Sequence, residues 1–187
     1  MLLKRIVGAL ALCVPALALA HTGDGSLHDH GLLAGFLHPF TGPDHLAAML
    51  AVGLWSALVQ RGRLMFVAPA SFAALLLMGA LAGMAGFALP MVEPLVAASV
   101  LVLGLLVAAR FQLGAAASAA LVGGFAFFHG LAHGAELQGY GALAGMVAAT
   151  ALLHIAGIAL GLKLSPKFTR AAGAGIAVLG LALVFTA

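Results

Sequence analysis

Apolar residues fill most of the chain in long runs, and short segments with charged residues, proline or glycine separate these runs. A transmembrane helix needs about 20 largely apolar residues to cross the hydrocarbon core of a bilayer. Six runs are of this order: 31–59, 64–89, a third that ends near 109, 113–135, 140–162, and a sixth that continues to the C-terminus. The pattern predicts an all-α polytopic membrane protein with six transmembrane helices.

The first run is too long for one straight helix. Residues 31–59 would form a helix of about 43 Å, whereas the hydrocarbon core is about 30 Å thick. Three helix-breaking residues interrupt this run: Pro39, Gly42 and Pro43. We therefore predict a short helix to about Leu37, an unwound turn, and a second helix from about Asp44 to Gln60. Asp44 would lie at the positive end of the second helix dipole, which favours a carboxylate.

The composition agrees with a membrane protein. Hydrophobic residues make up 64% of the 187 residues and charged residues only 7%, whereas a soluble domain carries about 25% charged residues. The net charge of +3 would suggest a nucleic-acid partner in a soluble chain, but here the basic residues lie between the apolar runs. We expect the lipid bilayer, and no nucleic acid, as a partner.

The first 20 residues have the pattern of a secretory signal peptide. Lys4 and Arg5 form a positive segment, residues 6–17 an apolar one, and Ala18-Leu19-Ala20 a cleavage site. The alternative is an uncleaved transmembrane helix. Cleavage after Ala20 would remove Cys13, the single cysteine, and leave no thiolate ligand in the mature chain.

Residues 21–30 form a short polar tail that contains three histidines and two aspartates. If the mature chain begins at His21, its α-amine and imidazole could chelate a metal ion together. The alternative is an ordinary polar leader. Residues 31–187 then form a single transmembrane domain.

The charges predict the orientation in the membrane. The basic residues beyond the signal peptide all fall on one side: Arg61, Arg63, Arg110, Lys163, Lys167 and Arg170. The acids fall on or toward the other side: Asp24, Asp29, Asp44, Glu93 and Glu136. Because basic loops stay in the cytoplasm, we predict that both mature termini are periplasmic and that the protein lies in the bacterial inner membrane.

The break in the first run carries the first candidate chemistry. His38, Asp44 and His45 lie in an otherwise apolar segment, and ionisable groups within a membrane usually mark a functional site or an ion pathway. Met49 lies four residues after His45 and shares its helix face, so its thioether is a candidate soft ligand. Filling of the core is the alternative role for Met49.

A second polar cluster lies near the end of the fourth run. His129, His133 and Glu136 follow one another at spacings of four and three, so they share one helix face. His45 and His129 each lie about 24 Å from the cytoplasmic boundary by residue count. The two clusters are therefore expected at the same depth, in the outer part of the membrane. The alternative is that these histidines only pack against other helices.

Two further residues are candidates of lesser weight. His154 would lie about 14 Å above the cytoplasmic side, where it is either a packing residue or a second station for an ion moving inward. Glu93 precedes Pro94 at the outer start of the third helix, where it either begins the helix or coordinates an ion at the entrance.

The combined donors are imidazole, carboxylate and one thioether. These donors suit divalent first-row ions such as Ni²⁺, Co²⁺ or Zn²⁺, whereas Ca²⁺ and Mg²⁺ prefer oxygen ligands.

Two longer motifs resemble the signatures of the HupE/UreJ family. They are His38-Pro39-x-x-Gly42-x-Asp44-His45-x-x-Ala48-Met49-x-x-x-Gly53-Leu54-Trp55 and Phe128-His129-Gly130-x-Ala132-His133-Gly134-x-Glu136. The likeness extends over the whole chain. The resemblance implies a nickel or cobalt permease in which His38, Asp44, His45, His133 and Glu136 are functional, with His129 alongside them.

The leading hypothesis is a permease that takes up Ni²⁺ or Co²⁺ as its substrate, with no permanent cofactor and no enzymatic activity. No nucleotide-binding loop is present in the sequence, so no nucleotide is expected as a partner. The sequence is compatible with a homo-oligomer but does not determine the oligomeric state. One alternative is an intramembrane zinc hydrolase, although no serine or tyrosine lies within either motif. A b-type haem protein is the other.

Overall fold

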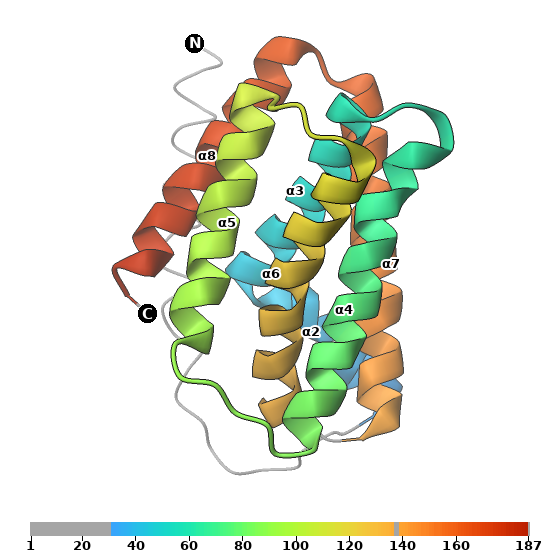
Figure 1. Cartoon of the computed structure of the whole chain (residues 1–187), viewed down its shortest axis with the longest axis vertical. Coiled ribbons are helices and arrows are strands. Elements are labelled where there is room, and N and C mark those ends of the chain that lie inside the picture. Colours follow the sequence, from blue (N-terminus) through green and yellow to red (C-terminus); the bar gives the residue numbers. More distant parts are fainter. Residues whose placement is uncertain (1–30, 137–138, 187) are drawn as a thin grey trace.

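The computed structural model describes residues 31–136 and 139–186, and in this part every regular element is a helix. The elements are α2 (Leu32–Thr41), α3 (Pro43–Val59), the short 3₁₀ helix η2 (Gly62–Phe66), α4 (Val67–Met84), α5 (Val92–Ala109), α6 (Ala115–Glu136), α7 (Tyr140–Lys163) and α8 (Pro166–Val184). Figure 1 shows them as one bundle. The signal peptide, the polar tail and His21 lie outside the described residues.

Five long helices and one bent pair account for the predicted spans. Helices α4 to α8, with η2 continuous with α4, are each long and apolar enough to cross a bilayer. Helices α2 and α3 pass the same test together and meet at an angle of 85°. The chain is therefore a multi-pass membrane protein with a broken first span, as predicted.

The break itself is narrower than predicted. Helix α2 continues through Pro39 and ends at Thr41, so the predicted end near Leu37 was wrong. The Thr41 hydroxyl donates a hydrogen bond of 2.8 Å to the His38 carbonyl and so satisfies an acceptor in the last turn. Only Gly42 leaves the helical conformation (φ −90°, ψ 117°), because it precedes Pro43, and a residue before proline is driven to extended backbone.

Glycines let the helices pack in three close pairs: α2 and α3 with α7, α4 with α6, and α5 with α8. A Cβ atom on Gly53 would lie 2.2 Å from the His154 carbonyl oxygen, and one on Gly130 would lie 2.1 Å from the Leu76 carbonyl oxygen. One on Gly104 would lie 2.3 Å from the Ala177 nitrogen. Such contacts between helices depend on small residues, as is common within membranes.

The same contacts fix the direction of each helix. Gly79 packs on Phe127 and Gly83 on Leu131, so α4 and α6 run parallel. Helix α3 likewise runs parallel to α7. We count α2 and α3 as a single crossing, because they pass the length test only as a pair. The connections after α3, α5 and α7 then meet at one end of the bundle, the top of Figure 1, and the six basic residues named above lie in these connections or in the adjoining turns of α7 and α8. The cytoplasmic identity of this end stays a prediction.

Helix α3 lies at the centre and contacts every other α-helix of the described bundle. Near its C-terminal end, the Trp55 indole donates a hydrogen bond of 2.9 Å to the Phe111 carbonyl. The Gln60 amide donates one of 2.7 Å to the Leu113 carbonyl. These bonds tie the α5–α6 connection to the C-terminal end of α3.

Helix packing leads to the first prediction, which compares two glycines of α6. Gly130→Ala should lower the free energy of unfolding by about 1–3 kcal/mol, because the new methyl group meets the α4 backbone. Gly124→Ala is the control, since no atom lies within 4 Å of its added Cβ. Thermal unfolding in detergent, followed by Trp55 fluorescence, measures the difference. Equal melting temperatures would contradict the assigned α4–α6 contact.

Candidate metal site

Four histidine rings from three helices meet near the α2–α3 junction. This histidine cluster consists of His38 from α2, His45 from α3, and His129 and His133 from α6. The His38 Nε2 and His133 Nδ1 atoms are 2.9 Å apart. The ring centroid of His45 lies 4.2 Å from that of His133 and 5.1 Å from that of His129. The structure thus brings together the two motifs that the residue count placed at one depth.

The cluster runs from the surface into the interior. The Glu136 side chain is 65% exposed and the His38 side chain 28%. The His45 side chain is 12% exposed, while His133 and His129 are 1% and 0% exposed. Glu136 and His38 therefore form the mouth of the cluster, and His129 forms its innermost part.

The outer ligand group consists of His38, His133 and Glu136, whose donor atoms all lie within 4.8 Å of one another. Donors bound to one first-row ion at about 2.1 Å are about 3.0 Å apart when cis and about 4.2 Å when trans. The His38–His133 separation of 2.9 Å and the His38–Glu136 separation of 3.8 Å fall close to this range. Small movements of the exposed Glu136 side chain would complete a three-donor site.

Helix dipoles act in opposite senses on the two carboxylates. Glu136 is the last residue of α6, where the negative end of the dipole disfavours a carboxylate unless a cation is near. Asp44 is the second residue of α3, where the positive end favours it. The position of Glu136 thus suits cation binding, and that of Asp44 suits a permanently charged partner for a histidine.

Asp44 orients His45. The Asp44 Oδ1 and His45 Nδ1 atoms are 2.7 Å apart, so the Nδ1–H of a neutral His45 donates to the carboxylate and leaves the lone pair on Nε2. That Nε2 atom is buried and has no hydrogen-bond partner within the described residues. A carboxylate that holds a histidine in this way is a common outer partner of metal-ligating histidines.

Ser99 of α5 orients His129 in the same way, although no sequence pattern marked Ser99 as a candidate. The Ser99 hydroxyl has one hydrogen, which it donates to the Val96 carbonyl at 2.6 Å. The Ser99 oxygen therefore accepts from Nε2–H of His129 at 2.8 Å, which leaves the His129 lone pair on Nδ1. No serine lies within either motif, but the fold brings a serine from another helix into contact with His129.

His133 faces both parts of the cluster. Its Nδ1 points to His38, and its Nε2 is buried without a hydrogen-bond partner in the part of the chain described. We call His45 Nε2, His129 Nδ1 and His133 Nε2 the inner nitrogens; all three are buried and unpaired. Buried polar atoms are nearly always paired, so three unpaired nitrogens in neighbouring rings require an explanation. Coordination of a metal ion provides one.

The other candidate residues lie apart from this cluster. Met49 is fully buried, and its Sδ accepts a hydrogen bond of 3.5 Å from the Thr150 hydroxyl. His154 is buried on α7, beside Phe72. Glu93 is exposed in the first turn of α5 and is not a member of the outer ligand group. Metal binding by these three residues stays a prediction.

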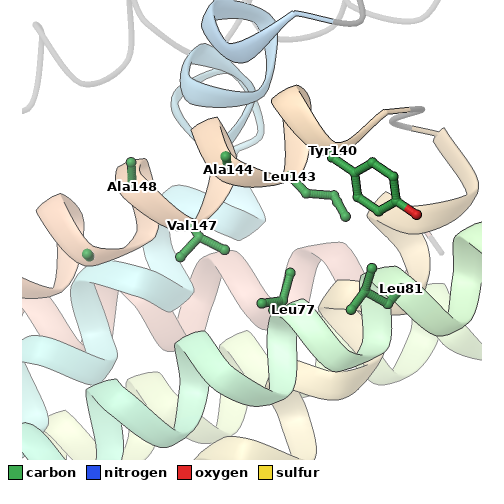
Figure 2. A pocket seen from close by; sticks show the side chains of 8 residues that line it. Leu77, Leu81, Tyr140, Leu143, Ala144, Val147 and Ala148 are labelled. Carbon is green, nitrogen blue, oxygen red and sulfur yellow. The ribbon is translucent and has the colours of Figure 1, made fainter.

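A groove of about 610 Å³ between α4 and α7 is a different feature. Figure 2 shows Leu77 and Leu81 of α4 on one side and Tyr140, Leu143 and Val147 of α7 on the other. Its lining is apolar apart from the Tyr140 hydroxyl, so it does not offer the donors that a metal ion needs.

Two comparisons identify relatives of the chain. The family model described as "HupE / UreJ protein" matches residues 9–183. The chain is 41% identical over 182 residues to "Protein HupE" of Rhizobium leguminosarum bv. viciae, and the match covers 93% of each chain. No solved structure gives a significant match.

The second prediction concerns Gly42, which separates α2 from α3. A Cβ atom there would lie 2.9 Å from both Asp44 Oδ1 and His45 Nδ1, so Gly42→Ala should displace this pair. We expect Co²⁺ affinity to fall about 10- to 100-fold, as for other changes in the outer shell of a metal site. Titration of purified protein, followed by Co²⁺ absorption, measures this, with Gly124→Ala as the control. Equal affinities in both variants would contradict the positioning role of Gly42.

Proposed function

Because this chain belongs to the HupE/UreJ family, we propose that it is a permease that takes up Ni²⁺ or Co²⁺ across the bacterial inner membrane. The observation that carries the proposal is the histidine cluster, in which buried, unpaired imidazole nitrogens lie directly behind an exposed carboxylate. Such groups are expensive inside a membrane and usually mark a pathway for an ion.

The chemistry of the donors supports a first-row transition metal as the substrate. The outer ligand group offers two imidazole nitrogens and one carboxylate, and the inner nitrogens come from imidazoles alone. Nitrogen donors suit Ni²⁺, Co²⁺ and Zn²⁺, whereas Ca²⁺ and Mg²⁺ would need more oxygen. Selection would occur as the ion leaves the exposed carboxylate and loses water among the imidazoles.

In this proposal His133 transfers the ion between two sets of ligands. When its lone pair is on Nδ1, it completes the outer ligand group with His38 and Glu136. When the lone pair is on Nε2, it joins the inner nitrogens of His45 and His129. A neutral imidazole carries one lone pair and one N–H, so the two sets would be used in turn. As the bond between Nδ1 and the ion breaks, Nδ1 would gain a proton and Nε2 would lose its own, and Nε2 would then bind the ion.

Asp44 and Ser99 take supporting roles. Each accepts the N–H of one histidine and thereby directs the other nitrogen toward the ion. Asp44 was predicted as a metal ligand, and its bond to His45 favours a positioning role instead. Glu93 and the histidines of the polar tail would gather ions outside.

The two alternative functions have less support. For a zinc hydrolase, in which the bound metal would activate water, the nearby Ser99 hydroxyl is fully buried and engaged with both Val96 and His129, so it is not free to bind a substrate or to transfer a proton. For a haem protein, the rings of His38, His45, His129 and His133 touch one another at centroid distances of 4.2–6.1 Å. A porphyrin does not fit between rings that are already in contact.

The third prediction tests the function. Cells that produce the protein should accumulate radioactive nickel or cobalt, and His133→Ala should reduce uptake to the level of cells without the protein, because it removes a ligand from both sets. Val178→Ala is the control and should keep full uptake, because Val178 is 67% exposed on the surface of α8. Immunoblots of membranes establish equal amounts. Undiminished uptake by His133→Ala or His45→Ala would contradict the proposed site.

The fourth prediction tests the orientation. With the basic end of the bundle in the cytoplasm and α2 and α3 forming one crossing, a reporter active only in the periplasm should be active when fused after Ala187. The same reporter fused after Arg63 should be inactive. The opposite result at either position would mean that the crossings are miscounted or the orientation is reversed.

A further inference from the structure

His154 is a buried histidine that is not part of the histidine cluster. It belongs to α7 and is 3% exposed, and its Nε2 atom is buried without a hydrogen-bond partner among the described residues. A buried nitrogen that makes no hydrogen bond costs free energy. A leucine would fill this position without that cost, so packing alone does not explain the imidazole.

His154 lies deeper in the bundle than the cluster. A Cβ atom on Gly53 would meet the His154 carbonyl oxygen at 2.2 Å, so these two residues share one level of the bundle. Gly53 follows His45 by eight residues, which is about 12 Å along α3. His154 is thus displaced from the cluster by about two helix turns toward the basic end.

Two further donors lie one helix turn from His154, on the side of the cluster. Met49 of α3 and Thr150 of α7 are both fully buried, and the Met49 Sδ atom lies 3.5 Å from the Thr150 Oγ1 atom. The Thr150 hydroxyl shares its one hydrogen with the Met146 carbonyl, which is nearer at 2.8 Å. The Met49 sulfur is therefore only weakly engaged, and its lone pairs stay available to an ion.

Helix geometry directs the His154 ring toward these donors. Thr150 and His154 are four residues apart, so they share one face of α7. Side chains of a helix lean toward its N-terminus, so the His154 ring lies over the turn that contains Thr150. Imidazole, hydroxyl and thioether are thus arranged around one small region beside the α3–α7 contact.

The donors of this region carry no charge. No aspartate or glutamate is among the buried residues of the part of the chain described, whereas the outer ligand group contains Glu136. Neutral donors hold a divalent cation less firmly than a carboxylate does, because the attraction between opposite charges is missing. Weaker binding suits a later step of conduction, since an ion must leave each site that it enters.

We propose that His154, Met49 and Thr150 form an inner station for the divalent cation, which the ion reaches after it leaves the histidine cluster. This inference rests on the proposed transport function. At the station the His154 Nε2 atom and the Met49 sulfur bind the ion, the Thr150 oxygen adds a weaker donor, and water fills the remaining positions. Imidazole and thioether donors suit a late first-row ion such as Ni²⁺ or Co²⁺.

The test uses the full-length protein in proteoliposomes that contain a fluorescent metal indicator, with Ni²⁺ added outside. His154→Leu keeps a similar bulk but removes the donor, so it should lower the maximal initial rate several-fold. Met49→Leu should lower the rate by a smaller factor. Both variants should keep the half-saturating Ni²⁺ concentration of wild type, because the histidine cluster is intact.

A cysteine at the same position separates a ligand from a packing residue. His154→Cys restores a donor and should recover part of the Ni²⁺ rate that His154→Leu loses. A thiolate is a softer ligand than an imidazole, so the ratio of the Cd²⁺ rate to the Ni²⁺ rate should rise several-fold over that of wild type. A role in packing would produce neither effect.

A control and a folding measurement accompany these variants. Met78→Leu should behave as wild type, because Met78 is 57% exposed on α4. Melting temperatures report the folding of each variant. If His154→Leu does not fold, the Cd²⁺ and Ni²⁺ rates of His154→Cys still test the station.

Two outcomes would overturn the inference. One is a wild-type Ni²⁺ rate in His154→Leu, and the other is a ratio of Cd²⁺ to Ni²⁺ rates in His154→Cys that equals the wild-type ratio. Wild-type proteoliposomes that take up neither Ni²⁺ nor Co²⁺ would instead contradict the proposed function itself. The two failures are therefore distinguishable.

Discussion

The structure depends on one constraint: an imidazole nitrogen inside a bundle surrounded by lipid must find a partner. Two of the nitrogens find a partner outside the cluster, at Asp44 and at Ser99, and His38 and His133 pair with each other. Each pairing fixes which nitrogen of the same ring keeps its lone pair, and these lone pairs are then directed into the cluster. The buried pairs thus determine the chemistry that the cluster presents, and the helices are arranged so that the rings can meet.

Close helix packing makes that meeting possible. The α4–α6 and α3–α7 contacts bring backbones together at glycines such as Gly130 and Gly53, so side chains that flank these glycines reach across to the next helix. Phe72, His129 and His154 come into contact in this way although they belong to three different helices. In a membrane, where lipid is as apolar as the helix surfaces, such packing is a main source of association.

The pairing of the helices is symmetric between the first three and the last three crossings, but the placement of the histidine cluster is not. If α2 and α3 count as the first crossing, the pairs are first with fifth, second with fourth, and third with sixth. If the first crossing is exchanged with the fourth, the second with the fifth and the third with the sixth, the same three pairs result. Transporters built from inverted repeats have this property. The histidine cluster breaks the symmetry, because His45 and His133 lie at the same end of the bundle. The scaffold is therefore regular, whereas the site is specific to one end.

The amino-acid sequence by itself determined the spans, the break after His38 and the two motifs that meet at the cluster. It could do so because bilayer thickness sets helix length, and because histidine, aspartate and glutamate are conspicuous in an apolar chain. Only the tertiary structure decided the partners of these residues. Ser99, Thr150 and Trp55 are ordinary residues of apolar helices, and their roles come from contacts with residues 30 to 101 positions away in the chain. Helix periodicity says which face a residue occupies, but not which helix lies opposite, so these contacts required the fold.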